Sequence, residues 1–548
     1  MTAALLVTAE EMRQLDRATI EGGHATGEAL MERAGAGLVA AMERRYGPML
    51  GMRVLVLCGP GNNGGDGLVA ARHLRARGAD ATVGVVADAG RLAGDARTML
   101  QRLEATGVHA VPLADEPAIA RLVAARDRWD YAIDALLGTG ARGAPEGTIA
   151  AAVQALRELD EAGTRIVAAD LPTGVHPDTG EIARRAVRAD LTVTFGAAKR
   201  GHLLYPGRAF TGRLEVVDIG LVPTAPDPER HPFELATPAG LAGLLPARDP
   251  RAHKGSVGRV LIVGGSVGLT GAVALAARAA ARTGAGYVQA AVPASLNDAL
   301  EAKLTEEMTV PVPETGARAF ALDALEPVLG RAERADALAV GSGLGRTPEA
   351  AELARQLVAR VAKPMVVDAD GLNALVGLTE TLARSGYPRV LTPHLGEASR
   401  LTGETPERLE GRRLDAAREW AGKLGAVLVL KGAPTVTASP AGLATVNSTG
   451  NAGLATAGTG DVLTGVIVAL LAQGLTPYDA ARLGVYLHGL AGDLAAEEIG
   501  PVGFTAGDCV ERMPAALRAL AHARDERLAG TESRRARAVR GPRSAEAL

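Results

Sequence analysis

The chain is organised around one stretch, Asn447-Ser-Thr-Gly-Asn-Ala-Gly-Leu-Ala-Thr-Ala-Gly-Thr-Gly-Asp461-Val-Leu-Thr-Gly465. Its glycines allow tight turns with bare backbone N–H groups, and the apolar run 462–471 predicts a buried helix that begins at this loop. Such a loop binds anions, because unpaired N–H groups and the helix dipole both favour negative charge. Asp461 falls in the first helical turn, where a carboxylate can take a proton from a hydroxyl that is being phosphorylated. An ordinary turn capped by Asp461 is the alternative, but the length of the string, with Asn447 and Asn451, favours a functional loop.

The composition is that of a globular protein with more than one domain. At 548 residues, of which 47% are hydrophobic and 22% charged, the chain has core material for two or three domains. The net charge of -3 gives no support to nucleic-acid or acidic-membrane binding. Cys58 and Cys509 are too few for a disulfide framework, which favours a reducing compartment. No basic leader and no bilayer-spanning apolar segment is recognised, so we expect a cytoplasmic protein.

Strand and helix patterns alternate in the first half, residues 1–222. Two short helices are expected within 8–35, and helical patterns separate most of the predicted strands. The alternation predicts a parallel sheet in a three-layer α/β domain. The predicted strands are Val54–Leu57, Ala81–Val86, Val108–Val111, Tyr131–Ile133, Ile166–Ala169 and Leu191–Thr194.

Three loops of this half follow predicted strands, at the sheet edge where such folds bind ligands. They are Gly59-Pro-Gly-Asn-Asn-Gly-Gly-Asp66-Gly67, Asp134-Ala-Leu-Leu-Gly-Thr-Gly-Ala-Arg-Gly143 and Asp170-Leu-Pro-Thr-Gly174. The first suits a phosphate at a helix N-terminus, with Asp66 in the first turn, although its spacing is not that of the common dinucleotide motif. Each loop alone could be a tight turn with a capping acid, but three on one edge favour a site.

Residues 8–220, which also contain Leu30-Met-Glu-Arg-Ala-Gly35 and Phe195-Gly-Ala-Ala-Lys-Arg-Gly201, resemble the NAD(P)H-hydrate epimerase family. The resemblance implies a Rossmann-like αβα domain that interconverts the R and S forms of hydrated NADH and NADPH, with Asp170 as acid or base beside the nicotinamide ring. It implies contacts of the dinucleotide with Asn62, Asn63, Gly64, Gly65 and Asp66, and of its phosphates with Gly138, Thr139, Gly140, Ala141, Arg142, Gly143 and Ala144.

The same resemblance implies a potassium ion bound by Asn63, Asp134 and Thr173. Hard oxygen ligands suit such a cation, whose charge would offset the phosphates. A buried Asp134 also requires a positive partner. The long fork of Arg142, the basic residue of these loops, suits a phosphate better than a small oxygen-lined hole.

The rest of the chain divides into three further segments. Residues 223–232 are rich in proline and predict a semi-rigid linker. Residues 233–521 repeat the alternating pattern with different loops, which indicates a fusion of two domains and not a duplication. Residues 522–548 mix charges with small residues and are predicted to be disordered.

Glycine-rich loops and acidic strand ends follow one another in the second half. In chain order they are Gly264–Gly271 before an alanine-rich helix, Val340–Gly345, Asp368-Ala-Asp370, Thr392-Pro-His394-Leu-Gly-Glu397, Lys431-Gly432 and Gly-Thr-Gly-Asp461. This order is similar to the ADP-dependent NAD(P)H-hydrate dehydratase family of the ribokinase-like superfamily. Thr459 and Leu395 stand where many relatives have Met and Pro.

That resemblance implies a ribokinase-like αβα domain that uses ADP and Mg²⁺ to dehydrate the S hydrate to NAD(P)H, giving AMP and phosphate. It places Asp461 as the catalytic residue. It places the hydrated dinucleotide at Ala272, Gly343, His394 and Asp461, and the adenine nucleotide at Lys431, Gly432, Ala433, Pro434, Thr435 and Gly460.

Two alternatives stay open. The second half could be a small-alcohol kinase fused to an unrelated domain, and the first half could be a non-catalytic nucleotide-binding module. The presence of Asn63, Asp134 and Asp170 argues against a loss of catalytic activity in the first half. No residue decides between ADP and ATP by its physics. We expect small-molecule substrates and a homo-oligomer, with no nucleic-acid or membrane partner.

Overall fold

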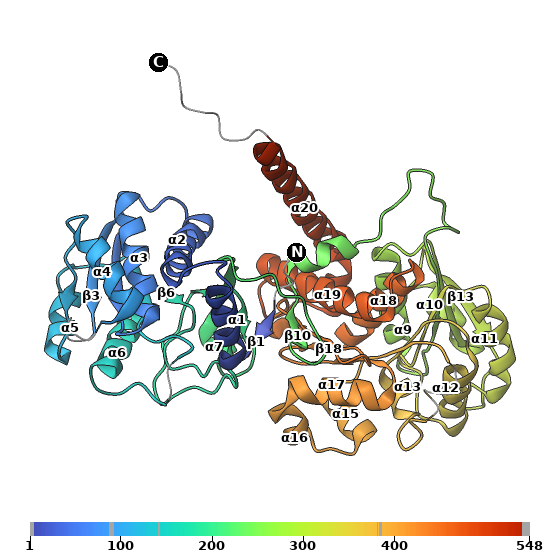
Figure 1. Ribbon diagram of the computed structural model, residues 1–548. Coiled ribbons are helices and arrows are strands. Elements are labelled where there is room, and N and C mark those ends of the chain that lie inside the picture. Colours follow the sequence, from blue (N-terminus) through green and yellow to red (C-terminus); the bar gives the residue numbers. More distant parts are fainter. Residues whose placement is uncertain (1–4, 87–91, 141–142, 381, 383–385, 540–548) are drawn as a thin grey trace. The chain divides into compact units, whose positions relative to one another are not determined.

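The computed structural model describes residues 5–86, 92–140, 143–380, 382 and 386–539. The chain forms two compact units, Met1–Pro226 and Asp227–Leu548 (Figure 1). The division falls inside the stretch 223–232 that the sequence predicts as a linker. Asp227 and His231 exchange backbone hydrogen bonds, and the Pro232 carbonyl accepts one from Ala444 N at 2.8 Å. Residues 227–232 are therefore part of the second unit.

The first unit contains a seven-stranded parallel sheet in the order β4-β3-β2-β5-β6-β7-β9, and a two-stranded sheet of β1 and β8. Its strands are β1 Leu6–Val7, β2 Arg53–Cys58, β3 Asp80–Val85, β4 Val111–Pro112, β5 Tyr131–Ala135, β6 Arg165–Ala169, β7 Leu191–Phe195, β8 Ala198–Lys199 and β9 Arg213–Val217. Its helices are α1 Ala9–Glu21, α2 Gly27–Tyr46, α3 Asn62–Ala76, α4 Gly94–Glu104, α5 Glu116–Val123, α6 Gly147–Glu161 and α7 Arg208–Thr211, with a 3₁₀ turn Arg200–His202.

Alternate side chains of β2 show why this unit has three layers. Val54, Val56 and Cys58 point into a core shared with α2, α3 and α4. Leu55 and Leu57 point into the core under α5 and α6. Because successive strand residues face opposite sides, a strand that is apolar throughout must be covered on both faces. The α/β prediction with a parallel sheet is confirmed.

Some details of this unit differ from the sequence prediction. The strand expected over 108–111 is β4, Val111–Pro112, a short edge strand whose proline cannot donate to a ladder. β9 was not predicted. The expected helices within 8–35 are α1 and α2, and α2 continues to Tyr46. α3 begins at Asn62, so Asp66 lies beyond its first turn and the predicted place of Asp66 in that turn is wrong, whereas its contact with the dinucleotide stays a prediction. The helix starts early because the turn takes up only Gly59–Gly61, and Gly64, Gly65 and Gly67 lie within α3.

The second unit contains a ten-stranded sheet in the order β10-β19-β18-β17-β16-β15-β14-β11-β12-β13, antiparallel only at the pairs of β18. Its strands are β10 Phe233–Leu235, β11 Arg259–Val263, β12 Tyr287–Pro293, β13 Met308–Val312, β14 Ala337–Val340, β15 Met365–Val367, β16 Arg389–Leu391, β17 Val427–Leu430, β18 Val436–Ala438 and β19 Ala444–Val446. Its helices include α8 Pro238–Leu241, α9 Thr270–Arg282, α10 Asn297–Glu301, α11 Leu325–Ala332, α12 Pro348–Arg360, α13 Ala369–Asn373, α15 Leu395–Thr402, α16 Pro406–Gly411, α17 Arg413–Leu424, α18 Thr459–Ala472, α19 Pro477–Ile499 and α20 Ala506–Val539.

Helices cover both faces of this sheet (Figure 1). One core joins α9, α18, α19 and α20 to inward side chains of β11 such as Val260 and Ile262. The helices α12, α15 and α17 lie on the other face (Figure 1). The buried helix predicted over 462–471 is the centre of α18, where every residue from Val462 to Ala472 is buried.

The C-terminal segment differs from its prediction of disorder over 522–548. Helix α20 continues to Val539, so the prediction is wrong for 522–539, and residues 540–548 lie outside the described residues. This segment is rich in alanine and arginine and has no proline between 515 and 539, which favours a helix. Among the described residues, no helix combines the length and the apolar character needed to cross a bilayer.

In both units the strand order reverses beside a glycine-rich loop. The first unit reverses at β2 and β5, and the second at β11 and β14. Loops at the carboxyl ends of two strands diverge at such a point and leave a crevice where α/β proteins bind ligands. The loops that the sequence singles out after β2, β5, β11 and β14 all stand there.

Candidate active sites in the two units

In the first unit, the start of α3 forms one wall of the candidate site. A Cβ on Gly64 would lie 2.0 Å from the Gly59 carbonyl oxygen, so only glycine allows this close approach of helix and loop. Asn63 and Gly65 are buried, whereas Asn62 is exposed and Asp66 is partly exposed. The helix N-terminus therefore presents Asn62 and the preceding loop to a ligand.

Asp134 and Thr173 form an oxygen cluster, and the loop 135–138 joins this cluster to Asn63. Thr173 donates its N–H to Asp134 Oδ2 and its hydroxyl to Oδ1, both at 2.8 Å. Burial raises the pKa of Asp134 to about 6, although the hydrogen bonds from Thr173 act to lower it. The buried amide of Asn63 has no hydrogen-bond partner at either atom among the described residues. A Cβ on Gly138 would lie 3.4 Å from Asn63 Oδ1, and Leu137 N donates to Thr173 Oγ1 at 3.1 Å, so all three side chains face one loop.

Asp170 lies at the end of β6 in an ion pair that the sequence prediction missed. Lys199 Nζ lies 2.5 Å from Asp170 Oδ1, and the lysine side chain is 1% exposed. Thr194 donates to the same carboxylate oxygen at 3.0 Å. Burial alone would raise the pKa of Asp170, but the Lys199 charge and these hydrogen bonds outweigh it and hold the pKa below its ordinary value. Asp170 is therefore an ionised carboxylate in a buried site.

The backbone at Asp170 is also unusual. Its φ is 64°, in the left-handed region that few residues other than glycine adopt. Buried His202 contacts the Asp170 carbonyl oxygen through Nε2 at 2.9 Å, while its Nδ1 accepts the Lys199 N–H at 3.0 Å. Burial lowers the pKa of His202 to about 3, so the ring is neutral and Nε2 is the donor. His202 thus holds the strained turn that presents Asp170.

Two further carboxyl groups lie in the electrostatic environment of this ion pair. Burial, opposed by Lys199 and reinforced by Asp170, raises the pKa of Asp16 to about 6. Burial and the charge of Asp170 also raise the pKa of Asp66 well above its ordinary value. The site therefore combines one carboxylate held ionised with neighbours that are readily protonated.

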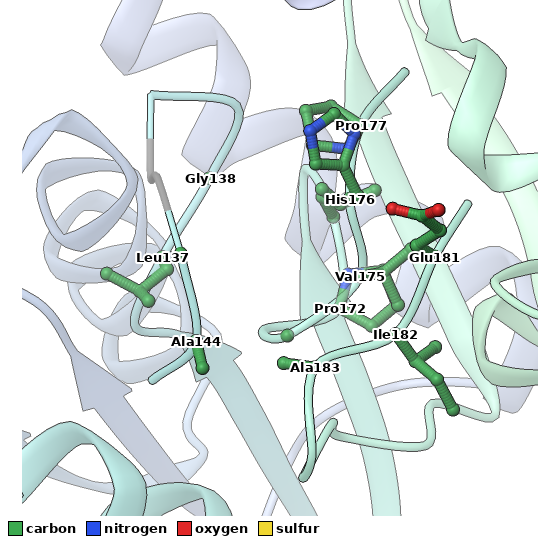
Figure 2. A pocket seen from close by; sticks show the side chains of 13 residues that line it. Leu137, Gly138, Ala144, Pro172, Val175, His176, Pro177, Glu181, Ile182 and Ala183 are labelled. Carbon is green, nitrogen blue, oxygen red and sulfur yellow. The ribbon is translucent and has the colours of Figure 1, made fainter. Parts of the chain in front are cut away.

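Residues of the loop after β5 line one side of a cavity (Figure 2). Gly138, Gly143 and Ala144 line it, together with the segment that follows Asp170. Thr139 is partly exposed and Gly140 is exposed. Ala141 and Arg142, also predicted to contact phosphates, lie outside the described residues.

In the second unit, Asp461 is brought together with Gly460 and Lys431. Asp461 is in the first turn of α18, as predicted. A Cβ on Gly460 would lie 3.3 Å from Lys431 Nζ, so the ammonium group lies against the turn that precedes Asp461. Burial raises the pKa of Asp461 to about 6, and the charge of Asp368 adds to this effect. Asp461 can therefore exchange a proton near neutral pH.

Lys431 is held by carboxylates to which the sequence analysis gave no role. Its Nζ lies 2.9 Å from Asp368 Oδ1 and 3.8 Å from Glu397 Oε2. Thr392 and Thr464 donate to Asp368 at 2.8 and 2.9 Å. Burial alone would lower the pKa of Lys431, but Asp368 and Glu397 raise it above its ordinary value. Lys431 is thus a fixed positive charge beside the predicted anion loop.

Residues 431–435 form a loop around one buried guanidinium group. Arg413 Nη1 donates to the carbonyl oxygens of Lys431 at 3.2 Å and Pro434 at 3.4 Å. A Cβ on Gly432 would lie 2.5 Å from Arg413. Thr435 Oγ1 donates to the Gly432 carbonyl at 3.0 Å. Arg413, which the sequence analysis did not identify, therefore shapes the predicted nucleotide loop.

The residues predicted to contact the hydrated dinucleotide come from separate loops, and Ser342, next to Gly343, forms a hydrogen bond with Asp461. Gly343 and Ala272 meet, since a Cβ on Gly343 would lie 3.1 Å from that of Ala272. His394 instead caps α15, where its Nδ1 accepts the N–H of Gly396 at 3.0 Å. Its Nε2 lies 3.5 Å from Glu397, which places it near the Lys431 network. Its predicted contact with substrate stays a prediction.

No group of three or more His, Cys, Asp or Glu side chains in the described part of the chain is arranged to hold a metal ion. The potassium ligands predicted in the first unit differ from such a group, because two of them are the amide of Asn63 and the hydroxyl of Thr173.

Comparison with known proteins agrees with this division. A family described as YjeF-related protein N-terminus matches residues 27–201, and the NAD(P)H-hydrate dehydratase family matches residues 260–515. A bifunctional NAD(P)H-hydrate repair enzyme of Moorella thermoacetica is 46% identical, over 94% of this chain and 97% of that protein. The chain belongs to the bifunctional NAD(P)H-hydrate repair enzymes. Another member, from Thermofilum pendens, is 42% identical over 93% of this chain and 95% of its own.

A solved structure resembles the second unit of this repair-enzyme chain. The ADP/ATP-dependent NAD(P)H-hydrate dehydratase of Bacillus subtilis, co-crystallised with ATP and Mg²⁺, is 31% identical. The match covers 52% of this chain and 98% of that one, with a TM-score of 0.45.

Proposed function

We propose that the first unit interconverts the R and S hydrates of NADH and NADPH. We further propose that the second unit uses ADP to dehydrate the S hydrate, giving NAD(P)H, AMP and phosphate. The observation that carries the second activity is the meeting of Asp461, Gly460 and Lys431 at the start of α18. The observation that carries the first is the buried, ionised Asp170 at the sheet edge. Membership of the repair-enzyme family supports both, and we keep a cytoplasmic homo-oligomer as a prediction.

Dehydration requires that a poor leaving group becomes a good one. Asp461 would take the proton of the ring hydroxyl as its oxygen attacks the terminal phosphorus of ADP, and AMP leaves. The ring nitrogen then donates its electron pair, the carbon–oxygen bond breaks and phosphate departs, and loss of a proton from the neighbouring carbon restores the dihydropyridine. Lys431 and the N–H groups of the glycine-rich loop would stabilise the negative charge of the transferred phosphoryl group.

Mg²⁺ fits this unit as an ion that binds with the nucleotide. It commonly keeps several waters and binds substrate phosphates with one or two carboxylates. Glu397 would be its protein ligand, because its Oε1 accepts no hydrogen bond from the described residues, and His394 Nε2 lies 3.5 Å from it. When bound, the ion neutralises charge on the phosphate groups.

Epimerisation inverts the ring carbon that carries the hydroxyl group. The hydroxyl group must leave from one face of the ring and return to the other. Both steps need a group that gives and takes a proton. Asp170 would serve as this group, kept ionised by Lys199 and presented by the turn that His202 holds. The N-terminus of α3 and the loop from Gly138 to Ala144 would bind the dinucleotide phosphates.

Potassium fits the oxygen cluster of the first unit. The amide of Asn63 is buried without a hydrogen-bond partner among the described residues, and burial raises the pKa of Asp134 to about 6, a shift that a bound cation would oppose. Asn63, Asp134 and Thr173 would hold the ion. When bound, it would offset the charges of Asp134 and the phosphates.

A coupled assay tests the two activities. The protein is given a mixture of R and S hydrated NADH with ADP or ATP, and the restored absorbance of NADH and the adenine product are followed. We expect complete restoration of NADH, AMP as the product from ADP, and restoration of only the S half when the first unit is inactivated. A stable phosphorylated alcohol would instead support the small-alcohol kinase alternative.

Replacing Asp134 by Ala should impair the first activity alone. We expect the epimerisation rate at low potassium to fall by about tenfold to a hundredfold, since removing a ligand or its support weakens metal sites by that amount. The dehydration rate should stay within about twofold of the wild-type rate, because the two units have separate cores. Both rates are measured on one preparation while potassium is varied.

The matched control for that variant is Asp130→Ala, which removes a carboxylate at the opposite end of the same strand, where it pairs with Arg53. Its potassium dependence should equal that of the wild type. Equal loss of both activities in Asp134→Ala, or an unchanged potassium dependence, would contradict the proposed site.

A chain that ends at Pro226 should fold alone and epimerise hydrated NADH without any adenine nucleotide. It carries its own sheet and cores, and the division of the chain falls there. Circular dichroism and the epimerisation assay check this. If epimerisation required residues beyond Pro226, the two activities would not belong to separate units.

A further inference from the structure

The glycine-rich loop 449–459, which leads to Asp461, is attached to one face of α19. Thr449 donates its hydroxyl to the Tyr486 carbonyl oxygen at 2.8 Å. A Cβ on Gly489 would lie 2.3 Å from Thr449 Oγ1, so the loop and the helix approach as closely as only glycine allows. The start of the loop is therefore fixed to a helix of the second core.

Asp493, one turn further along α19, binds the next two residues of the loop. Its Oδ2 accepts the Gly450 N–H at 2.9 Å, and its Oδ1 accepts the side-chain amide of Asn451 at 3.0 Å. The same amide donates to the Gly492 carbonyl oxygen at 3.0 Å. Gly450 has a φ of 100°, so the turn that presents its N–H to Asp493 favours glycine. Hydrogen bonds to a carboxylate are about twice as strong as neutral ones, so this is a firm attachment.

Asn451 extends the attachment to the rest of the loop. Its Oδ1 accepts the Gly453 N–H at 3.0 Å, at the start of a 3₁₀ turn. Leu454, the last residue of that turn, accepts the hydroxyl of Thr459 at 3.0 Å through its carbonyl oxygen. Contacts therefore lead from Asp493 to the first residue of α18, two residues before the proposed base.

A second contact from α19 reaches the other end of the loop. The ring of His488 forms a hydrogen bond with the backbone of Thr459. Burial lowers the pKa of His488 to about 4, so the ring is neutral at physiological pH. Both ends of the loop are thus held by one helix.

We propose that Asp493 and Asn451 are positioning residues, which set the glycine-rich loop in the conformation that binds the phosphate groups of ADP. The first N–H groups of α18 have no partner within the helix, and the loop that enters the helix determines where they point. A loop that is fixed in advance loses little conformational freedom when a ligand binds. The inference rests on the proposed use of ADP by the second unit.

Exchange of the two side chains tests this role on the intact protein. The Kd of ADP with Mg²⁺ is measured by isothermal titration calorimetry for the wild type, Asp493→Asn, Asn451→Asp and the double variant. Each single variant should weaken ADP binding by about tenfold, the effect of one hydrogen bond to a charged group. In the double variant the carboxylate and the amide exchange places, so their hydrogen bond is restored and most of the affinity should return.

The matched control is Glu498→Gln, which removes a carboxylate of the same helix that pairs with Arg512. It should keep the wild-type Kd. The KM for ADP should follow the Kd in every variant, whereas the KM for the S hydrate should change little. Partial unfolding would instead lower kcat and leave the Kd of the folded fraction unchanged, and thermal unfolding measures that fraction.

A wild-type Kd in both single variants, or a double variant that binds no better than they do, would overturn the positioning role. A wild type that binds ADP but does not dehydrate the S hydrate would overturn the proposed function, and the four Kd values would still decide the role of the pair. A wild type that does not bind ADP would overturn both.

Discussion

Asp461→Asn should lower the dehydration rate by about two powers of ten or more, with a smaller change in substrate binding. Asparagine keeps the size of the side chain, but it cannot accept the hydroxyl proton. The charge of Lys431 beside Gly460 would still bind the nucleotide phosphates. The kcat and KM for the S hydrate and for ADP are measured, with epimerisation on the same sample expected to stay unchanged.

The matched control is Asp479→Asn. Asp479 occupies the same position in the first turn of α19 that Asp461 occupies in α18, but it pairs with Arg482 and not with Lys431. The control should keep its dehydration rate. Near-normal turnover in Asp461→Asn would exclude Asp461 as the base.

The pH dependence of dehydration should report the same carboxyl group. Burial raises the pKa of Asp461 to about 6, and a base must be unprotonated to act. The wild-type rate should therefore fall as the pH drops through about 6. The residual rate of Asp461→Asn should lack this step, and a step of the same size in both proteins would assign the titration to another group.

The meeting of Asp461 with Gly460 and Lys431 could be predicted because parallel strands end at one edge of a sheet. Lys431 follows β17, and the loop before α18 returns to the same edge. Asp368 shows the limit of this reasoning. The sequence Asp368-Ala-Asp370 offers two equivalent acids, and the left-handed backbone at Ala369, with a φ of 48°, sends them to different partners. Asp368 pairs with Lys431, and Asp370 pairs with Arg346.

Lys199 could not be predicted for a different reason. In the sequence, Ala-Ala-Lys-Arg resembles an exposed basic pair. The burial of Lys199 depends on β8, a strand of two residues. The parallel partner of β8 is β1, which lies near the start of the chain and far from Lys199 in the sequence. No periodicity signals such a pair, because its position is set by tertiary contacts. Arg413 is a similar case, since its partners, apart from nearby Glu410, are backbone carbonyls of a distant loop.

Lys199→Met should abolish most epimerisation and destabilise the first unit. Lys199 is 1% exposed and Asp170 11%, so removing the ammonium group leaves a buried carboxylate without its cation. Breaking such a pair by removing one partner costs about 3–5 kcal/mol in the free energy of unfolding. We also expect the epimerisation rate to fall by about two powers of ten, because the pKa of Asp170 is no longer held down by Lys199. Thermal unfolding of the chain ending at Pro226 and both activities of the intact protein are measured.

The pH dependence of stability distinguishes this pair from ordinary packing. The folded-state pKa of Asp170 lies below its ordinary value. Its contribution is therefore present above the unfolded value of about 3.9 and is lost as the pH falls through the folded value. Lys199→Met should lack this contribution, so the stability difference from the wild type should shrink as the medium becomes acidic.

The double variant Asp170→Asn/Lys199→Met separates stability from chemistry. With both charges removed, no buried ion is left unpaired, and the free energy of unfolding should recover much of the loss. Epimerisation should not recover, since asparagine cannot exchange the proton. The cycle is completed with Asp170→Asn, which leaves the Lys199 ammonium buried and should also be unstable. If the double variant is no more stable than Lys199→Met, or if Lys199→Met epimerises at the wild-type rate, the ion pair is not what keeps Asp170 ionised and ready to act.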